Sequence, residues 1–370
     1  MNFAPHVKVF IVGGYVRDRL LDRECKDHDF VVVGSTPDEM LAMGFQQVGA
    51  DFPVFLHPLT NDEFALARTE RKVGAGYSGF ETEFGTNVTL EDDLARRDLT
   101  INSMARRVVG FNELGHAKLD DTVVDPFGGQ EDLRDGVLCH TTAAFAEDPL
   151  RVLRVARFRA RLGFSVAPAT MEMMRTLVRA NEMEALTTER VFAELEKALS
   201  EDSPHLFFRT LQECGAFDRL FPGIDPRCAN FKSRHKTTLT MRLLHLFFDA
   251  PPELLKRMKA PTDVQRLVAK FQTLLAFGDD ELMDPQTMFG ALKAVDAFRR
   301  PDDLETVASA LNSFDPGLFG RATILRMALE AAQTVSFASL PSDMRDSLSG
   351  REVGEAIDQL RLLEVSKTLR

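Results

Sequence analysis

Apolar and polar positions follow two different patterns along the chain. Up to about residue 140, short runs rich in β-branched residues stand between turns rich in Gly and Asp. Such runs at residues 7–12, 30–33 and 122–124 predict strands, and the mixture with helix-like stretches predicts a mixed sheet. Residues 73–85 contain four glycines and little periodicity, so this segment is predicted to be a loop.

From residue 148 onward, apolar positions recur at spacings of three and four, which is the pattern of amphipathic helices. Residues 150–158, 171–178 and 191–199 carry it most clearly, and Thr187 or Thr188 is the expected N-cap of the last of these helices. Beyond residue 200 the pattern stays helical and is punctuated by prolines. The order of patterns predicts a sheet-containing part followed by an all-helical part.

Composition narrows the class of protein. A length of 370 residues predicts two or three domains, with 44% hydrophobic and 27% charged residues, as in a soluble protein. No apolar run is long enough for a membrane span, and four scattered cysteines indicate neither a zinc knuckle nor a disulfide framework. We therefore expect a reduced, cytoplasmic protein. The net charge of −11 argues against a generally basic nucleic-acid coat but not against a local basic groove.

The first candidate for chemistry is the turn that follows the first predicted strand. Gly13 and Gly14 let backbone N–H groups approach a phosphate, and Arg17 adds a cation one helical turn later. The turn lacks the GK[ST] ending of a P-loop and the third glycine of a dinucleotide fingerprint. A phosphate-binding turn and a purely structural turn both fit this pattern.

The second candidate is a pair of carboxylates, Asp27 and Asp29, before an apolar strand. Residues two apart in a strand face the same side, and two carboxylates there repel each other unless a cation lies between them. The pair predicts either a Mg²⁺ site or a solvated turn, and its position after the glycine turn favours the metal site. His28 faces the other way and is interpreted as a packing or surface residue.

Arginines form the remaining candidates. Arg97 precedes a helix-like stretch and is placed to meet a triphosphate, with Asn102 at a sugar hydroxyl; the alternative is a solvated face. Residues 151–161 contain five arginines and no acid, more than a packing helix needs, and Arg151, Arg154 and Arg157 form one helical ridge. The acceptors of Asp148 and the donors of Arg151 suit the edge of a nucleobase. A further segment, 189–194, fits a structural role at least as well as a catalytic one.

Seven segments in this order resemble the class II tRNA nucleotidyltransferases, which are the CCA-adding enzymes, and the related bacterial poly(A) polymerases. They are GGYVRD, KDHDFVVVG, ARTERK, LEDDLARRDLTINSMA, VDPFGGQEDL, EDPLRVLRVARF and TTERVFAELEKAL, and they cover roughly residues 7–225. The runs VVVGSTPDEML and DFPVFLHP look most like the CCA-adding enzymes of gamma-proteobacterial type. The resemblance implies an α+β fold with three parts along the chain. These are a polymerase-beta-like nucleotidyltransferase head with a mixed sheet over 1–140, a helical neck over 141–210, and a helical, tRNA-binding body and tail over 211–370.

The implied activity is template-independent addition of CCA to the 3′ end of tRNA, with CTP and ATP as substrates and Mg²⁺ as the metal. The resemblance implies that Asp27 and Asp29 hold two Mg²⁺ ions, and Glu63 is a candidate third carboxylate. It also implies phosphate binding by Gly13, Gly14, Arg17 and Arg97, base reading by Asp148 and Arg151 with support from Arg154 and Arg157, and a hinge at 125–129. The partners are then the 3′ end and acceptor stem of tRNA, and no membrane.

The chain departs from the gamma-proteobacterial pattern in its last third. Those enzymes usually carry an HD-type phosphohydrolase, yet only His235 and His245 follow residue 225, and no His-Asp pair does. The basic residues Lys232, Arg234, Lys236, Lys256, Arg257 and Lys259 would follow a tRNA backbone or form a solvated helix face. Two alternatives stay open: a relative that adds poly(A), only CC or only A, and a non-catalytic RNA-binding relative. The intact set of Asp27, Asp29, Arg97, Asp148 and Arg151 disfavours the latter.

Overall fold

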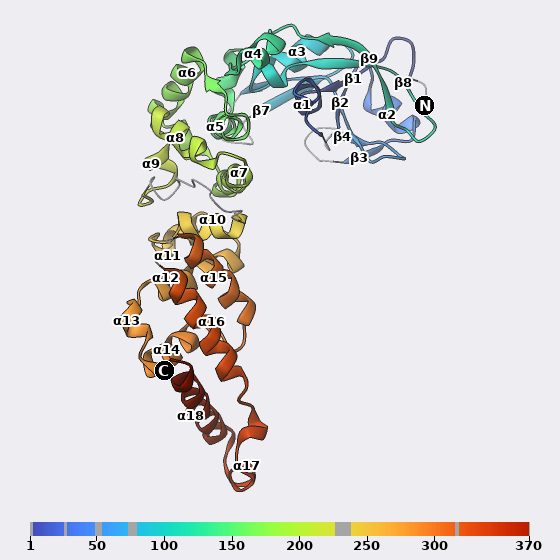
Figure 1. The fold of residues 1–370 in the computed structure, drawn as a ribbon. Coiled ribbons are helices and arrows are strands. Elements are labelled where there is room, and N and C mark those ends of the chain that lie inside the picture. The colour runs from blue at the N-terminus through green and yellow to red at the C-terminus, as the bar shows by residue number, and fades with distance from the viewer. Residues whose placement is uncertain are drawn as a thin grey trace. The chain divides into compact units, whose positions relative to one another are not determined.

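The computed structural model describes residues 3–25, 28–48, 54–72, 80–225, 238–314 and 318–369 (Figure 1). The chain divides into two compact units, Met1–Leu220 and Phe221–Arg370. The strands all lie in the first unit, and the second is helical over its described residues. The predicted boundary between head and neck, at residue 140, falls inside the first unit. The separation of these two parts therefore stays a prediction.

The first unit contains these elements in order: β1 (Lys8–Val12), α1 (Gly14–Leu20), β2 (Asp29–Val33), α2 (Pro37–Ala42), β3 (Gln46–Val48), β4 (Val54–Leu56), β5 (Glu63–Leu66), β6 (Arg68–Lys72), β7 (Phe80–Phe84), α3 (Leu90–Ala95), the 3₁₀ turn η1 (Thr100–Asn102), β8 (Ala105–Phe111), β9 (Ala117–Val124), α4 (Gly129–Asp135), β10 (Val137–Leu138), η2 (Ala143–Glu147), α5 (Leu150–Leu162), β11 (Ser165–Val166), α6 (Pro168–Arg179), η3 (Glu182–Ala185), α7 (Thr188–Ser200), α8 (Pro204–Cys214) and α9 (Phe217–Leu220).

Seven strands form one mixed sheet in the order β3-β4-β5-β2-β1-β8-β9. Only β2 and β5 run parallel, and the other neighbours are antiparallel. The apolar runs predicted as strands are β1, β2 and the end of β9. Of these three strands, β1 and β2 are mostly buried, whereas β9 is not. The α+β fold expected from the sequence is therefore confirmed.

The prediction of a loop over residues 73–85 is wrong for residues 80–84. Residues 80–84 form β7, which pairs antiparallel with β6, while residues 73–79 lie outside the described part of the chain. The alternation Phe-Glu-Thr-Glu-Phe has the two-residue period of a strand. The loop is predicted because residues 73–85 contain four glycines, and the five-residue alternation is too short to change that prediction.

The helices predicted at 150–158, 171–178 and 191–199 are α5, α6 and α7. Helix α5 packs against both α7 and α8, with Leu153 and Val155 fully buried. Thr187 is the N-cap of α7, as expected, but its side chain makes no capping hydrogen bond. Helix α4 approaches η1 so closely that a Cβ atom on Gly129 would stand 2.3 Å from the carbonyl oxygen of Thr100, which explains a glycine there.

The second unit packs helices around a core of phenylalanine and leucine. Its elements are α10 (Leu239–Leu246), α11 (Pro252–Arg257), α12 (Thr262–Leu275), α13 (Asp279–Leu282), α14 (Pro285–Ala294), α15 (Pro301–Phe314), α16 (Phe319–Gln333), η6 (Phe337–Ser339), α17 (Ser342–Ser347) and α18 (Gly350–Thr368). The packing joins α15 to α10, α12 and α16, and α16 to α18. No helix within the described ranges combines the length and the apolar character that crossing a bilayer requires.

His245 belongs to this core. Its ring lies against Phe271 and Phe314, and Nε2 is 2.9 Å from the carbonyl oxygen of Ala310 and 3.2 Å from Ser313 Oγ. Burial lowers the pKa of His245. This histidine therefore packs as a neutral side chain, and His235 lies outside the described residues.

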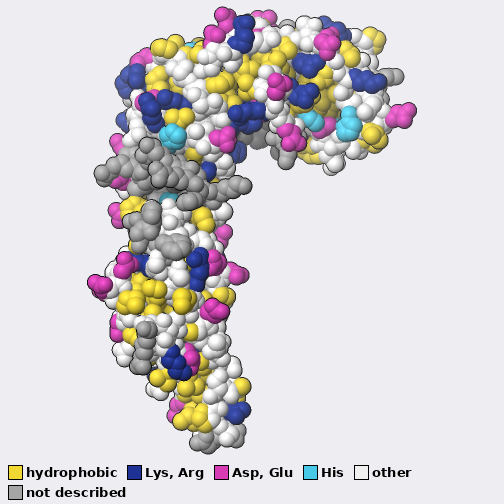
Figure 2. All heavy atoms as spheres, in the orientation of Figure 1, with side chains coloured by type: hydrophobic (Ala, Val, Ile, Leu, Met, Phe, Trp, Pro, Cys, Tyr) yellow, Lys and Arg dark blue, Asp and Glu magenta, His cyan; other side chains and the backbone are white. Residues whose placement is uncertain are grey.

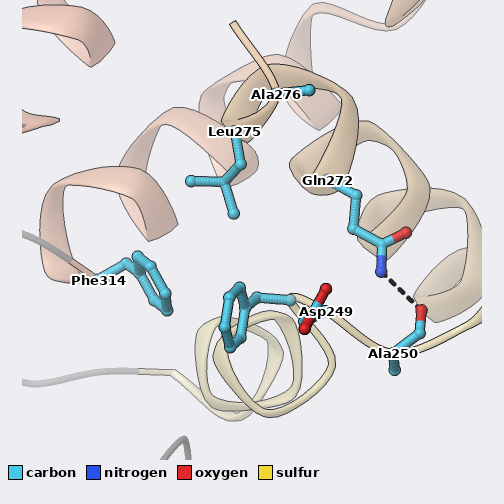
Figure 3. A pocket seen from close by; sticks show the side chains of 7 residues that line it. Asp249, Ala250, Gln272, Leu275, Ala276 and Phe314 are labelled. Atoms are coloured by element: carbon cyan, nitrogen blue, oxygen red, sulfur yellow. Dashed lines mark hydrogen bonds between the residues drawn. The ribbon is translucent and has the colours of Figure 1, made fainter. Parts of the chain in front are cut away.

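A hollow of about 550 Å³ opens on the second unit beside α12 and α15 (Figure 3). Phe248, Leu275 and Phe314 form its apolar walls. The amide of Gln272 closes one side by donating to the carbonyl oxygens of Ala250 at 2.8 Å and Phe247 at 3.0 Å. Asp249 is the one acidic side chain among the described residues that line it.

Charged side chains are mixed on the surface. Figure 2 shows acidic and basic groups interspersed over the visible face of each unit. Lys256, Arg257 and Lys259 are exposed on α11 and just after it, whereas Lys232, Arg234 and Lys236 lie outside the described residues. The visible face thus carries no continuous basic coat, in keeping with the net charge of −11.

Candidate active site

The glycine turn lies at one end of the central strands. β1 ends at Val12, and Gly13 turns the chain into α1 with a φ of 66°, a conformation that favours glycine. The N–H of Gly13 donates to the carbonyl oxygen of Met104 at 3.0 Å. A Cβ atom at position 13 would lie 3.0 Å from Arg97 Nη1, so the turn and this guanidinium face each other closely.

Two carboxylates meet at the same end of the sheet. Asp29 begins β2 and stands directly opposite Glu63, the first residue of β5, in a parallel register. Directly opposed residues of neighbouring strands project to the same face of a sheet. Asp27 lies outside the described residues, so the structure does not describe the pair with Asp29. Among the described residues, no group of three metal-ligating side chains is close enough to hold an ion.

His28 contacts other residues and does not form part of a metal-binding group within the described part of the chain. Its ring makes an edge contact with Tyr15, with centroids 5.2 Å apart, and Nδ1 is 3.4 Å from Asp62 Oδ1. These contacts fit the packing role expected from the sequence.

Asp93 holds the two consecutive arginines in place. Its fully buried carboxylate accepts from Arg96 Nη2 at 2.7 Å and from Arg97 Nη2 at 3.1 Å. Burial tends to raise the pKa of Asp93, but the two guanidinium groups overcome it and lower the pKa. Arg97 thus keeps a fixed position beside the glycine turn while its side chain stays one-fifth exposed.

Arg17 is buried, and its guanidinium bonds to side chains of the protein. Its Nε donates to Asp18 Oδ1 at 2.8 Å, and Nη1 donates to Asn102 Oδ1 at 2.5 Å. Asn102 in turn donates to Asp98 Oδ1 at 3.0 Å. The sequence interpretation placed Arg17 at phosphates and Asn102 at a sugar hydroxyl; the structure joins them to each other, and those roles stay predictions.

Asp98 links this network to α5. Its Oδ2 accepts from Arg154 Nε at 2.7 Å, and the carboxylate is almost fully buried. Burial raises the pKa of Asp98, but Arg154 and the Asn102 amide outweigh it and bring the pKa down to about 2. The same pairing raises the pKa of Arg154. The ion pair therefore stays charged throughout the neutral range.

The proposed base-reading residues also have protein partners. Asp148 accepts from the backbone N–H of Leu150 at 3.0 Å and from Arg190 Nη2 at 2.8 Å. Arg151 is buried and donates to the carbonyl oxygens of Ala144 at 2.7 Å and Arg96 at 2.5 Å. Arg190 lies in the segment 189–194, for which the sequence left a structural and a catalytic role open, and the structure places it beside Asp148.

The other arginines of α5 make contacts between elements. Arg157 donates to Glu194 of α7 at 2.7 Å, and Arg159 donates to Glu213 of α8 at 2.6 Å. The sequence argument that these arginines exceed the needs of packing is therefore wrong for Arg157 and Arg159, since acids from neighbouring helices pair with them. The structure brings Arg97 to the glycine turn and Arg154 to Asp98, while Arg157 faces α7.

A glycine turn, an arginine against it and two carboxylates in register at one sheet end are what transfer of a nucleotidyl group needs, and the chain's family matches assign it to the nucleotidyltransferases. Residues 9–139 match the family profile described as the Poly A polymerase head domain. Residues 163–228 match the profile described as a probable RNA and SrmB-binding site of polymerase A.

The chain belongs to the family of the CCA-adding enzymes. It is 43% identical to a multifunctional CCA protein of Pseudomonas putida over 96% of this chain and 98% of that protein. It is 42% identical to a CCA-adding enzyme of another Pseudomonas putida strain, over 96% and 97% of the two chains. The fold is similar to that of the Bacillus stearothermophilus CCA-adding enzyme in complex with CTP, with a TM-score of 0.69 and 23% identity over 98% of this chain and 89% of that one.

The pairing of Asp98 predicts how stability depends on pH. The pKa of Asp98 in the folded protein is about 2, below its ordinary value of 3.8. The stabilisation that the ionised carboxylate provides is therefore present above pH 4 and is lost as the pH falls toward 2. We expect the unfolding free energy of the unmodified protein to drop by about 2 kcal/mol more than that of Asp98→Asn over this window. Urea denaturation at several pH values measures this. The exposed Asp121 provides the control Asp121→Asn, and parallel curves for the unmodified protein and Asp98→Asn would contradict the assignment.

Proposed function

We propose that this protein adds cytidine and adenosine residues to the 3′ end of tRNA without a template, building CCA from CTP and ATP. The observation that carries the proposal is the meeting of Gly13, Arg97, Asp29 and Glu63 at one end of the sheet. It is supported by similarity to curated CCA proteins along nearly the whole chain. The free thiols of Cys139 and Cys214 suit the reducing cytoplasm, where we place the enzyme.

The carboxylates at the sheet end fit a magnesium site. Asp29 and Glu63 present hard oxygen atoms on neighbouring strands in direct register, which is the ligand chemistry that Mg²⁺ prefers. Asp27, two residues before Asp29, would add a third carboxylate. Bound Mg²⁺ would favour ionisation of the tRNA 3′-hydroxyl and offset the charge of the triphosphate.

The chain's own residues would position the nucleotide. Gly13 gives the phosphates close access to the backbone, and Arg97, held by Asp93, supplies a fixed positive charge beside it. Asp148 and Arg151 at the start of α5 offer acceptors and donors for the base edge. Because both now bond within the protein, we infer that base binding exchanges a bond such as Asp148–Arg190 for a bond to the base.

RNA binding would involve the helices that follow. α6 to α9 lie within the segment matching the profile of a probable RNA-binding site. On the second unit, Lys256, Arg257 and Lys259 are exposed and would contact phosphates of the tRNA backbone. The proposed arrangement is head, neck, and body with tail over residues 1–140, 141–210 and 211–370.

A second candidate is a polymerase of the same family with a different product. It would add only adenosine residues, or only part of CCA. The specific observation in its favour is that the matched head profile is described by poly(A) polymerase.

Incubation with tRNA tests the proposed function and separates these products. We expect the protein, with Mg²⁺ and both CTP and ATP, to extend tRNA lacking CCA by three nucleotides. We expect CTP alone to extend it by two, and ATP alone to extend only tRNA ending in CC. Gel analysis and sequencing of the 3′ ends measure the products. Long adenosine tails, or addition that stops after CC with both nucleotides present, would assign the second candidate.

Substitution of Asp29 tests the metal site. We expect Asp29→Ala to lower nucleotide addition by at least about a thousandfold, because loss of a metal ligand removes several kcal/mol of transition-state stabilisation. Without metal, the variant should still fold, because Asp29 is exposed at the first position of β2. Thermal unfolding with and without Mg²⁺ supplies the second readout, with Asp121→Asn as control. Near-normal addition by Asp29→Ala would refute the metal assignment.

Substitution of Arg151 tests base reading. Arg151→Ala should change the preference between CTP and ATP by about tenfold to a hundredfold, as expected when a group that pairs with a base edge is lost. It should also lower thermal stability, because two half-buried carbonyl oxygens lose their donor. Steady-state kinetics with each nucleotide measure the preference. An equal loss for both nucleotides would instead make Arg151 a structural residue or a phosphate ligand.

A further inference from the structure

Asp18 is a buried carboxylate to which the proposed mechanism gives no role. It is 3% exposed and lies in α1, directly after Arg17. Its Oδ1 accepts from Arg17 Nε and Nη2, each at 2.8 Å. Its Oδ2 accepts from Arg161 Nη2 at 2.8 Å, and Arg161 lies in the last turn of α5. One carboxylate therefore bridges the glycine turn and the end of α5.

A second route joins the same two elements. Arg17 bonds to Asn102, Asn102 to Asp98, and Asp98 to Arg154 of α5. Arg154 and Arg161 are two turns apart on one face of α5. Phe158 lies between them in the sequence, and the guanidinium carbon of Arg17 is 5.0 Å from the centroid of its ring. Together with the backbone of α5 between Arg154 and Arg161, these contacts close a ring, here called the α1–α5 ring. It consists of Arg17, Asp18, Arg161, Phe158, Arg154, Asp98 and Asn102.

The ring restricts motion because its charged groups are buried or half-buried. A buried charge that loses its partner is strongly unfavourable, so Asp18 and Arg17 strongly favour this one arrangement. α5 begins two residues after Asp148 and carries Arg151 in its first turn. The position of the glycine turn and the position of the base-reading residues are therefore tied together through α5.

We propose that Asp18 and Arg161 are positioning residues that set the separation between the phosphate-binding turn and the base-reading start of α5. Neither side chain contacts the nucleotide. They hold Arg17 and α5 in register, so that triphosphate and base bind at the same time. This inference rests on the proposed function, since it assigns the spacing of the same nucleotide site.

Substitution of Arg161, which the mechanism does not use, tests the inference. We expect Arg161→Met to raise the KM for CTP about tenfold and to lower the preference for CTP over UTP, with kcat changed less than twofold. Because Arg161 makes one bond to Asp18, Arg161→Lys can replace it and should recover most of both values. Asp18→Asn should resemble Arg161→Met, and the double variant should be little worse than either.

Arg159→Met is the matched control. It removes an ion pair of the same helix, two residues away, but with Glu213 of α8 instead of the head. We expect a similar fall in thermal stability with KM and base preference unchanged. Equal kinetic changes in Arg159→Met and Arg161→Met, or no recovery in Arg161→Lys, would overturn the positioning role. Failure of the unmodified protein to extend tRNA would instead refute the proposed function, so the two outcomes are distinct.

Discussion

A carboxylate taken out of water is stabilised only if charged or strongly polar partners surround it. Three such carboxylates, Asp18, Asp93 and Asp98, stand between the sheet end and the helices of the first unit, and arginines pair with all three. The proposed phosphate contacts of Arg17 and Arg97 depend on this pairing, because Asp18 and Asp93 hold these two arginines beside the glycine turn.

This arrangement explains how an acidic chain can present the proposed site for a triphosphate. The net charge of −11 is spread over the whole molecule, whereas Arg97 stands at the glycine turn with a single buried acid behind it. On α5, the arginines are divided among different partners. Arg154 and Arg161 bind the head, and Arg157 and Arg159 bind the neighbouring helices. One helix thus connects the nucleotide site with the helical segment that follows.

The second unit is stabilised in a different way. Its helices pack mainly through apolar side chains, and His245 takes part as a buried neutral ring. Charged pairs also join its helices: Lys270 of α12 pairs with Asp303 of α15, and Arg326 of α16 pairs with Glu305 of α15. Its described part is therefore held together by apolar packing between helices, with charged pairs added between them.

The sequence by itself determined what depends on short spacings. The period of apolar residues predicted the strands and α5 to α7. The ordered motifs indicated the family and named the candidate site residues, whose roles stay predictions. Local geometry alone allows Asp93 to reach Arg96 and Arg97, since residues three and four apart share a helix face. Only the tertiary structure decided the rest. Asp29 meets Glu63 through strand register, and Asp18 meets Arg161 across 143 residues because α5 packs on the head. Arg151 bonds to main-chain carbonyl oxygens, which no side-chain pattern records. Such contacts depend on how elements distant in the chain are packed, and periodicity carries no information about that.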